Sequence, residues 1–269
     1  MKKDINLARI IAFANNKGGV GKTTSVAAIG VLLAREGYRT LLVDLDAQCS
    51  LTECFIRNGE AKDNVFTLLT SPLGNLPDAI VKGGSFQTPQ PGLDLIPSCP
   101  EVTELENILS GKTNREMILS RVFRALNVSK DYDAVLIDCP PSLGLLTQNA
   151  LVAATDGLVV PTTAEYMPLM GLQKIQAKCA ELADYFDPGI GIDAILINHF
   201  NSSKGLHTAV DEALRAHYGD VVLQTRIREN IRLAECPQYR KPIFDYAPAS
   251  NGAADYMSLL PEFIKRFKL

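Results

Sequence analysis

The chain has 269 residues, of which 46% are hydrophobic and 21% charged, the composition of an ordinary folded globular protein. Disorder requires low hydrophobicity and high net charge, so wholesale disorder is excluded. Against 30 Asp and Glu residues stand 27 Lys and Arg residues, a net charge of −3. The whole chain is therefore no polycation, and any nucleic-acid binding has to come from a local basic patch.

The six cysteines are scattered and form no Cys-x-x-Cys pair. We therefore expect neither a disulfide framework nor a zinc module, and a reducing, cytoplasmic location. The longest apolar stretch, residues 26–34, is about half of what a membrane span requires. The basic start is followed by a short apolar segment that runs into a glycine-rich loop, so we predict no signal peptide.

Short apolar strands alternate with helix-length segments along the chain. We predict a helix at residues 23–36, closed by Gly37, and strands at residues 10–14, 40–44, 93–97, 134–138, 157–161 and 193–198. Near-continuous apolar, β-branched runs are typical of strands covered on both faces. We therefore predict an α/β fold, a mainly parallel sheet flanked by helices on both faces, in a single domain spanning residues 1–269. Residues 71–92, rich in Pro and Gly, are expected to form a surface excursion.

The first predicted strand and helix are joined by a glycine-rich turn that contains a variant of the phosphate-binding P-loop, with Asn16 where the usual pattern has its first glycine. Its glycines let backbone N–H groups converge on phosphate oxygens, and the following helix points its positive end at the same anion. Lys22 supplies a charge for the β- and γ-phosphates, and the Thr23 hydroxyl is placed to bind Mg²⁺. We therefore predict a P-loop NTPase whose nucleotide contacts include Gly18, Gly19, Val20, Gly21, Lys22, Thr23 and Thr24.

Aspartates stand at the ends of two predicted strands. Alternation places Asp44 and Asp46 on the same side, near the P-loop. An alternative is that one of the two caps the following helix. Asp138 ends another apolar strand, which is the Walker B arrangement that holds Mg²⁺ directly or through water.

Together these motifs resemble the deviant Walker A family of ATPases, ParA/MinD. The resemblance extends to residues 44–48, with Ala47 where the family has proline, and to the second switch at residues 140–144. Residues 230–237 look like the ParA-type segment NVRLSEAP, which favours the DNA-partitioning branch. The resemblance therefore covers nearly the whole chain.

This resemblance implies ATP and Mg²⁺ as cofactors and assigns roles to individual residues. Lys17 reaches across a nucleotide-sandwich homodimer to the partner's phosphates, and Asp46 positions the attacking water. Thr23 and Asp138 serve the metal, and Asp44 lies near the Mg²⁺ shell. Asn198, at a predicted strand end, is either an adenine contact or an ordinary polar turn residue.

The resemblance also implies partners: an ATP-dependent homodimer, DNA bound without sequence preference, and a ParB-like centromere-binding protein that stimulates hydrolysis, at a nucleoid-associated location in the cytoplasm. The segment from Arg226 to Lys241 has five basic and two acidic residues, a local charge of +3. Such side chains contact phosphates without reading sequence. We predict DNA contacts at Lys204, Arg226, Arg228 and Arg232; the alternative is a solvated basic face.

Three other functions are alternatives. A MinD-like membrane-associated ATPase would use the amphipathic residues 261–269, although a last helix packed on the core explains them better. An iron–sulfur reductase would need paired cysteines, and Cys139 has no recognisable partner. An ATP-dependent ligase or kinase would need its own acid/base group, but His199, His207 and His217 show no grouping and are expected at the surface or in turns.

Overall fold

A computed structural model describes residues 7–56, 60–82, 90–165 and 168–269. In chain order the elements are β1 Arg9–Phe13, α1 Lys22–Arg35, β2 Thr40–Asp44, α2 Ser50–Phe55, α3 Val65–Thr70, β3 Leu93–Ile96, η1 Pro100–Glu104, α4 Leu105–Ser110, η2 Arg115–Met117, α5 Ile118–Ala125, α6 Val128–Asp131, β4 Ala134–Asp138, α7 Leu145–Ala153, β5 Gly157–Thr163, α8 Pro168–Tyr185, β6 Ala194–Phe200, α9 Gly205–Tyr218, η3 Gly219–Val221, β7 Val222–Arg228, α10 Ile231–Tyr239, α11 Ile243–Tyr246 and α12 Asn251–Phe267.

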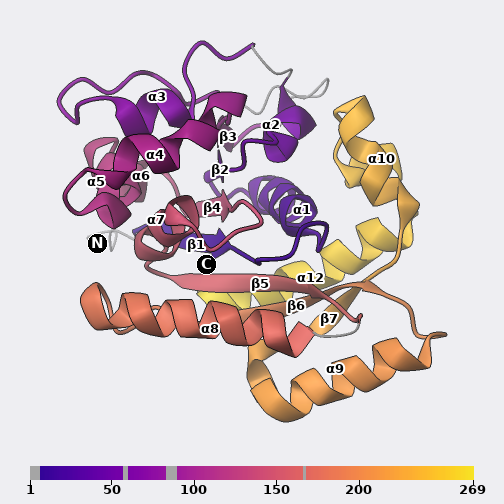
Figure 1. The fold of residues 1–269 in the computed structure, drawn as a ribbon. Helices are drawn as coiled ribbons and strands as arrows, with labels where there is room; N and C mark the ends of the chain where they lie inside the picture. The colour runs from indigo at the N-terminus through magenta and orange to yellow at the C-terminus, as the bar shows by residue number, and fades with distance from the viewer. Residues whose placement is uncertain (1–6, 57–59, 83–89, 166–167) are drawn as a thin grey trace, which may run out of the picture.

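The strands form one seven-stranded sheet in the order β3-β2-β4-β1-β5-β6-β7, and every neighbouring pair is parallel (Figure 1). This confirms the predicted α/β class and each of the predicted strands. The sequence did not predict β7, which closes one edge of the sheet. Its pairing with β6 is interrupted by register shifts between Ile195 and Phe200.

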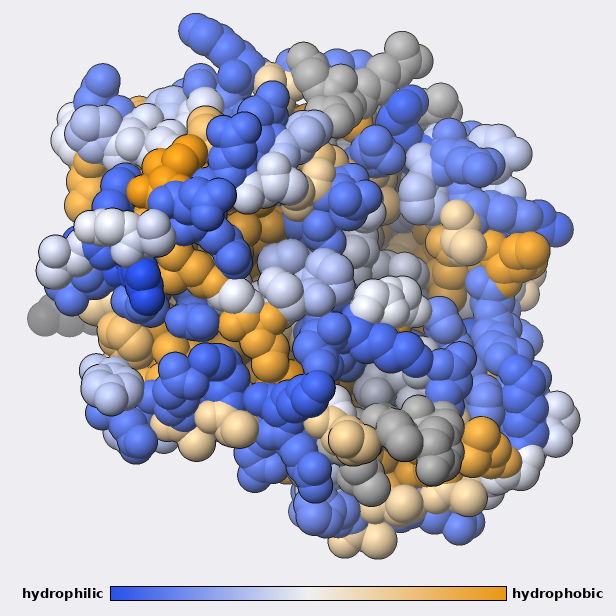
Figure 2. Space-filling view, in the orientation of Figure 1, coloured by the Kyte–Doolittle hydropathy of each residue, from blue (hydrophilic) through white to orange (hydrophobic). Residues whose placement is uncertain are grey.

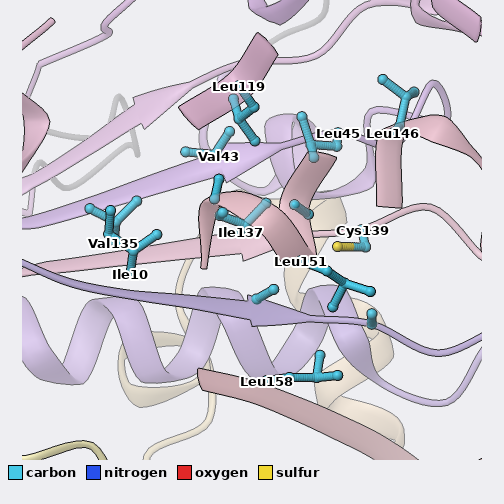
Figure 3. Packing of buried hydrophobic residues seen from close by; sticks show 14 of the residues in the cluster. Ile10, Val43, Leu45, Leu119, Val135, Ile137, Cys139, Leu146, Leu151 and Leu158 are labelled. Atoms are coloured by element: carbon cyan, nitrogen blue, oxygen red, sulfur yellow. The ribbon is translucent and has the colours of Figure 1, made fainter. Parts of the chain in front are cut away.

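Successive residues of the central strands point to opposite faces of the sheet, as the period of a strand requires. Ile10 and its neighbours on β2 and β4 pack with α5 and α7 (Figure 3), in a cluster that α3, α4 and α8 also join. Ile11 and Phe13 face the other way, toward α1, α2, α11 and α12. Both faces are therefore covered, which explains why the strands are apolar along their whole length.

The last helix, α12, contains the amphipathic segment at the end of the chain. Phe263 and Phe267 on this helix are buried against the sheet, so the apolar side of the segment is used in the core and the packed-helix interpretation is confirmed. No helix within the described ranges is long and apolar enough to cross a membrane. On the face drawn in Figure 2, hydrophobic side chains occur in separate small groups between hydrophilic ones.

All strands of a parallel sheet end at the same edge, where open α/β sheets bind their ligands. The loop after β1, the aspartates that end β2 and β4, and Asn198 on β6 meet at this edge. Positions far apart in the sequence are thereby brought around one cleft.

Candidate nucleotide site

The P-loop connects β1 to α1 and forms one wall of a cleft of about 680 Å³. Gly21 is the residue immediately before α1 and has φ of +83°, a left-handed conformation that favours glycine. The backbone N–H groups at the start of α1 have no partner within the helix, so they are free to bind an anion. The cleft is lined by Gly18, Gly19, Gly21, Lys22, Thr23 and Thr24 on this side.

Lys22 is the first residue of α1, and its side chain folds back over the loop. Its Nζ lies 3.4 Å from the backbone oxygen of Lys17, and the residue is buried. A buried ammonium group with so weak a partner is available for an anionic ligand in the loop.

Asp138 is the last residue of β4 and is fully buried beside Thr23. Its Oδ2 accepts a hydrogen bond of 2.7 Å from the Thr23 hydroxyl, while its Oδ1 is buried and has no partner among the described residues. An orphaned carboxylate oxygen beside a hydroxyl is a donor set that fits Mg²⁺. Thr23 and Asp138 are therefore the residues that could hold the metal.

Asp44 is the neighbour of Asp138 in the sheet, and its carboxylate is fully engaged within the protein. Oδ2 accepts hydrogen bonds from the backbone N–H and the hydroxyl of Thr52 on α2, and Oδ1 accepts one from the Asp46 N–H. The structure therefore favours the capping alternative for Asp44, which fastens α2 to the end of β2. Thr52, which the sequence reasoning missed, is the polar residue on the buried side of this short helix.

Two buried carboxylates lie side by side at this point, which is costly without a cation. Burial raises the pKa of Asp44 to about 6, although its hydrogen bonds with Thr52 oppose that shift. Burial raises the pKa of Asp138 well above its ordinary value and the Asp44 charge raises it further, while Thr23 and Lys22 lower it. A bound cation would relieve this repulsion, and its charge would lower both pKa values.

Asp46 lies beyond the end of β2, so the alternation that was expected to align it with Asp44 no longer applies. Asp46 lines the cleft, whereas Asp44, like Asp138, is fully buried and does not line it. The Asp46 Oδ1 accepts a hydrogen bond from the Gln48 N–H at 3.0 Å. Its other oxygen has no protein partner among the described residues, as an acceptor for a substrate or water requires.

Lys17 points away from its own loop's cleft and forms an ion pair with Glu165, with Nζ and Oε2 2.6 Å apart. Both side chains are 57% exposed, and Lys17 does not line the cleft. This ion pair could not be predicted from the sequence, because Glu165 follows β5 and is far from Lys17 along the chain. The Lys17 ammonium is thus at the surface, where another molecule could approach it.

Asn198, near the end of β6, is only 1% exposed and faces the P-loop. Its Nδ2 donates to the Val20 carbonyl oxygen at 2.8 Å and lies 3.4 Å from the Ser25 hydroxyl. Its Oδ1 is buried and has no partner among the described residues, and the adenine contact expected at this residue stays a prediction. Asn198 is therefore a buried strand residue beside the P-loop and not a polar turn residue.

The four residues predicted to contact DNA lie along β7, α10 and the loop before α9, and each is paired with a carboxylate. The pairs are Lys204 with Glu229, Arg226 with Asp211, Arg228 with Asp255 and Arg232 with Glu235. Arg226 also lies over the Phe200 ring. In the same segment Arg240 and Lys241 form no ion pair with any residue that the structure describes.

The histidine prediction is wrong at one of three positions. His207 on α9 is buried, and its Nδ1 accepts a hydrogen bond from the Asn201 N–H at 3.1 Å. His199 and His217 are exposed, as expected. All six cysteines are free and buried, and no group of three or more His, Cys, Asp or Glu side chains within the described ranges could hold a metal ion.

The parallel sheet, the loop before α1 and the aspartate that ends β4 define a P-loop NTPase. Comparisons with known proteins extend this. The sequence profile of a family described as AAA domain matches residues 8–192. The sporulation initiation inhibitor protein Soj of Bacillus subtilis is 36% identical over 257 residues, 95% of this chain and 98% of that protein. The chromosome partitioning protein ParA of Myxococcus xanthus is 35% identical, covering 97% of this chain and 89% of that protein.

The chain therefore belongs to the ParA/Soj family. Among solved structures, cobyrinic acid a,c-diamide synthase from Mycobacterium smegmatis is similar with a TM-score of 0.80 and 29% identity, covering 97% of this chain and 96% of that chain. That enzyme was solved with bound ADP and magnesium and with an ATP analogue and magnesium. Homologous structures thus carry the nucleotide and metal that were expected here from the sequence.

Proposed function

We propose that this protein is an Mg²⁺-dependent ATPase of the ParA type, in which ATP drives formation of a homodimer and the dimer binds DNA without sequence preference. The observation that carries the proposal is the meeting of the P-loop with Thr23 and the half-satisfied carboxylate of Asp138. This arrangement offers an anion site and a cation site side by side, as a metal–triphosphate complex requires.

Within this proposal the chain's own residues have distinct tasks. The loop from Gly18 to Thr24 and Lys22 bind the phosphates, and Thr23 and Asp138 hold Mg²⁺, which would neutralise phosphate charge. Asp44 supports this metal site indirectly by fixing the end of β2. Asp46, with a free oxygen facing the cleft, orients the attacking water.

The exposed position of Lys17 supports the dimer. Its ion pair with Glu165 is at the surface, where such pairs contribute about 0–1 kcal/mol, so the lysine is easily released. A second molecule that presents its nucleotide can therefore capture Lys17 for its own phosphates.

The ion pairs on the DNA side support a dimer-dependent affinity. Each predicted DNA contact already has a carboxylate partner, so a single protomer offers phosphates little uncompensated charge. Two linked protomers double the number of weak contacts. Once one protomer is bound to DNA, binding of the other becomes an intramolecular step. In the same proposal, a ParB-like protein stimulates hydrolysis and ends DNA binding at the nucleoid.

Two alternatives are less well supported. The MinD-like membrane role needs the apolar side of the final segment, which is buried on the core in α12. The name of the M. smegmatis structure suggests a synthase role. However, that chain is 29% identical to this one, whereas the chromosome partitioning protein ParA is 35% identical.

The test is size-exclusion chromatography and DNA retention of the full chain with no nucleotide, with Mg-ADP and with Mg-ATP. We expect a monomer that elutes from DNA at low salt in the first two conditions, and a dimer retained to higher salt in the third. Equal DNA retention in all three conditions would contradict the proposal. Flotation with anionic liposomes in the same conditions tests the membrane alternative.

A further inference from the structure

A buried chain of hydrogen bonds connects the last helix to the P-loop. The Tyr256 hydroxyl on α12 lies 3.0 Å from the Ser25 hydroxyl on α1. Ser25 Oγ lies 3.4 Å from Nδ2 of Asn198 on β6, and that nitrogen donates to the Val20 carbonyl oxygen at 2.8 Å. The chain thus runs through three separate elements and ends on the backbone of the loop.

Every member of this chain is buried, and two of them, Asn198 and Tyr256, also border the cleft. Val20, Ser25, Asn198 and Tyr256 are each at most 1% exposed. A buried donor or acceptor that loses its partner cannot turn to solvent, so each bond in the chain constrains the next. The loop backbone also lies directly against the amide, since a Cβ on Gly21 would stand 2.5 Å from Asn198 Nδ2.

The hydrogen bond from Asn198 to the Val20 carbonyl fixes the orientation of the peptide group between Val20 and Gly21. In a planar trans peptide the carbonyl and the following N–H point in opposite directions. Because Asn198 holds the Val20 carbonyl on its own side, the N–H of Gly21 is turned away from that carbonyl, and Gly21 itself lines the cleft. That N–H is one of the groups with which a P-loop binds phosphate.

We propose that Asn198, held by Ser25 and Tyr256, is a positioning residue that aims the Gly21 N–H at the phosphate chain of the nucleotide. The inference rests on the proposed function only in that the P-loop binds a metal–triphosphate. It differs from the adenine contact predicted from the sequence, because its target is the polyphosphate and not the base.

The decisive measurement compares ATP with inorganic triphosphate, which has no base. Displacement of a fluorescent ADP analogue from the full chain, in the presence of Mg²⁺, gives the affinity for each. We expect Asn198→Ala to weaken both by the same factor, about 5- to 10-fold, and Tyr256→Phe to weaken both by about 2- to 5-fold, the size of one or fewer net hydrogen bonds.

Tyr132→Phe is the matched control, because Tyr132 is also buried and its hydroxyl is bonded, but to Lys82 and Asp94 away from the cleft. It is expected to change neither affinity. Tyr256→Phe removes only the hydroxyl oxygen. It therefore tests the role of the hydrogen-bond chain even if Asn198→Ala does not fold. Thermal unfolding without nucleotide monitors folding of every variant.

The outcomes separate the hypotheses. Loss of ATP affinity in Asn198→Ala with unchanged triphosphate affinity would identify an adenine contact and overturn the proposal. Unchanged affinity for both ligands in folded Asn198→Ala or Tyr256→Phe would reduce the chain of bonds to a packing role and overturn it as well. A wild-type protein that binds neither ATP nor triphosphate would overturn the proposed function itself.

Discussion

Two regions at the same edge of the sheet differ in whether their charged side chains have partners within the protein. Around the P-loop, Lys22 has only a weak protein contact and one oxygen of Asp138 has none among the described residues. Along β7 and α10, every predicted DNA contact is matched by a carboxylate. Polar groups without protein partners in the first region indicate a site for a tightly bound ligand. Charges that are already paired in the second region indicate a surface that binds DNA weakly until a dimer doubles it.

The largest effect is expected in the first region. Lys22→Ala removes a buried cation from the anion site, so we expect the affinity for Mg-ATP to fall by about 100-fold or more. Lys241→Ala is the matched control, because this lysine lines the same cleft away from the loop. Isothermal titration calorimetry measures both variants. Wild-type affinity in Lys22→Ala, or an equal loss in Lys241→Ala, would contradict the assignment.

Asp46→Ala separates hydrolysis from binding in the same region. Without the free carboxylate oxygen the attacking water is not oriented, so turnover should fall by about 100-fold while ATP still binds and still produces a dimer. Phosphate release and size-exclusion chromatography in Mg-ATP measure the two properties. An Asp46→Ala protein with normal turnover would refute the role of this residue.

The second region is tested by a pair of variants with opposite signs. Arg232→Ala removes a contact to DNA phosphate, so retention on DNA in Mg-ATP should weaken about 2- to 5-fold. Glu235→Gln removes the carboxylate that neutralises Arg232, so retention should strengthen by a similar factor. The salt dependence of each variant should change by about one phosphate contact per protomer, downward and upward respectively.

The charge of Glu235 at neutral pH follows from its partners. The Tyr246 hydroxyl and the Arg232 guanidinium donate to its carboxylate and hold its pKa below the usual value. Glu235→Gln therefore changes the charge at any pH near neutrality. Mg-ATP affinity should be unaltered in both variants. Identical DNA retention in the two would return this segment to the alternative of a solvated basic face.

The contrast between the regions also marks what the sequence could predict. The P-loop and the aspartate that ends β4 were predicted from the local order of elements, a strand followed by a loop and a helix, which can be seen in the sequence. Two of the carboxylate partners lie outside the basic segment: Asp211, which pairs with Arg226, is on α9, and Asp255, which pairs with Arg228, is on α12. A charge count over residues 226–241 therefore overestimates the positive potential of that surface.

Other misses have the same origin. The edge strand β7 has the sequence VLQTRIR, in which polar and charged residues interrupt the apolar run that marks the other strands. His207 is buried, and its ring accepts a hydrogen bond from the N–H of Asn201, which precedes α9. The partner of Lys17, Glu165, follows a strand that pairs with β1. Each of these depends on packing between elements, which residue spacing does not specify.

The smallest effect on stability is expected at the ion pair of Lys17 and Glu165, which joins a P-loop residue to a surface carboxylate. Both groups are largely exposed, so Glu165→Gln should change the free energy of unfolding by less than about 1 kcal/mol. Asp156→Asn is the comparison, because Asp156 is largely buried and accepts hydrogen bonds from Arg9 and the Ile10 N–H. It should cost about 1–3 kcal/mol. Urea unfolding without nucleotide measures both, and a loss in Glu165→Gln as large as in Asp156→Asn would show that Lys17 is firmly held and not available to a second molecule.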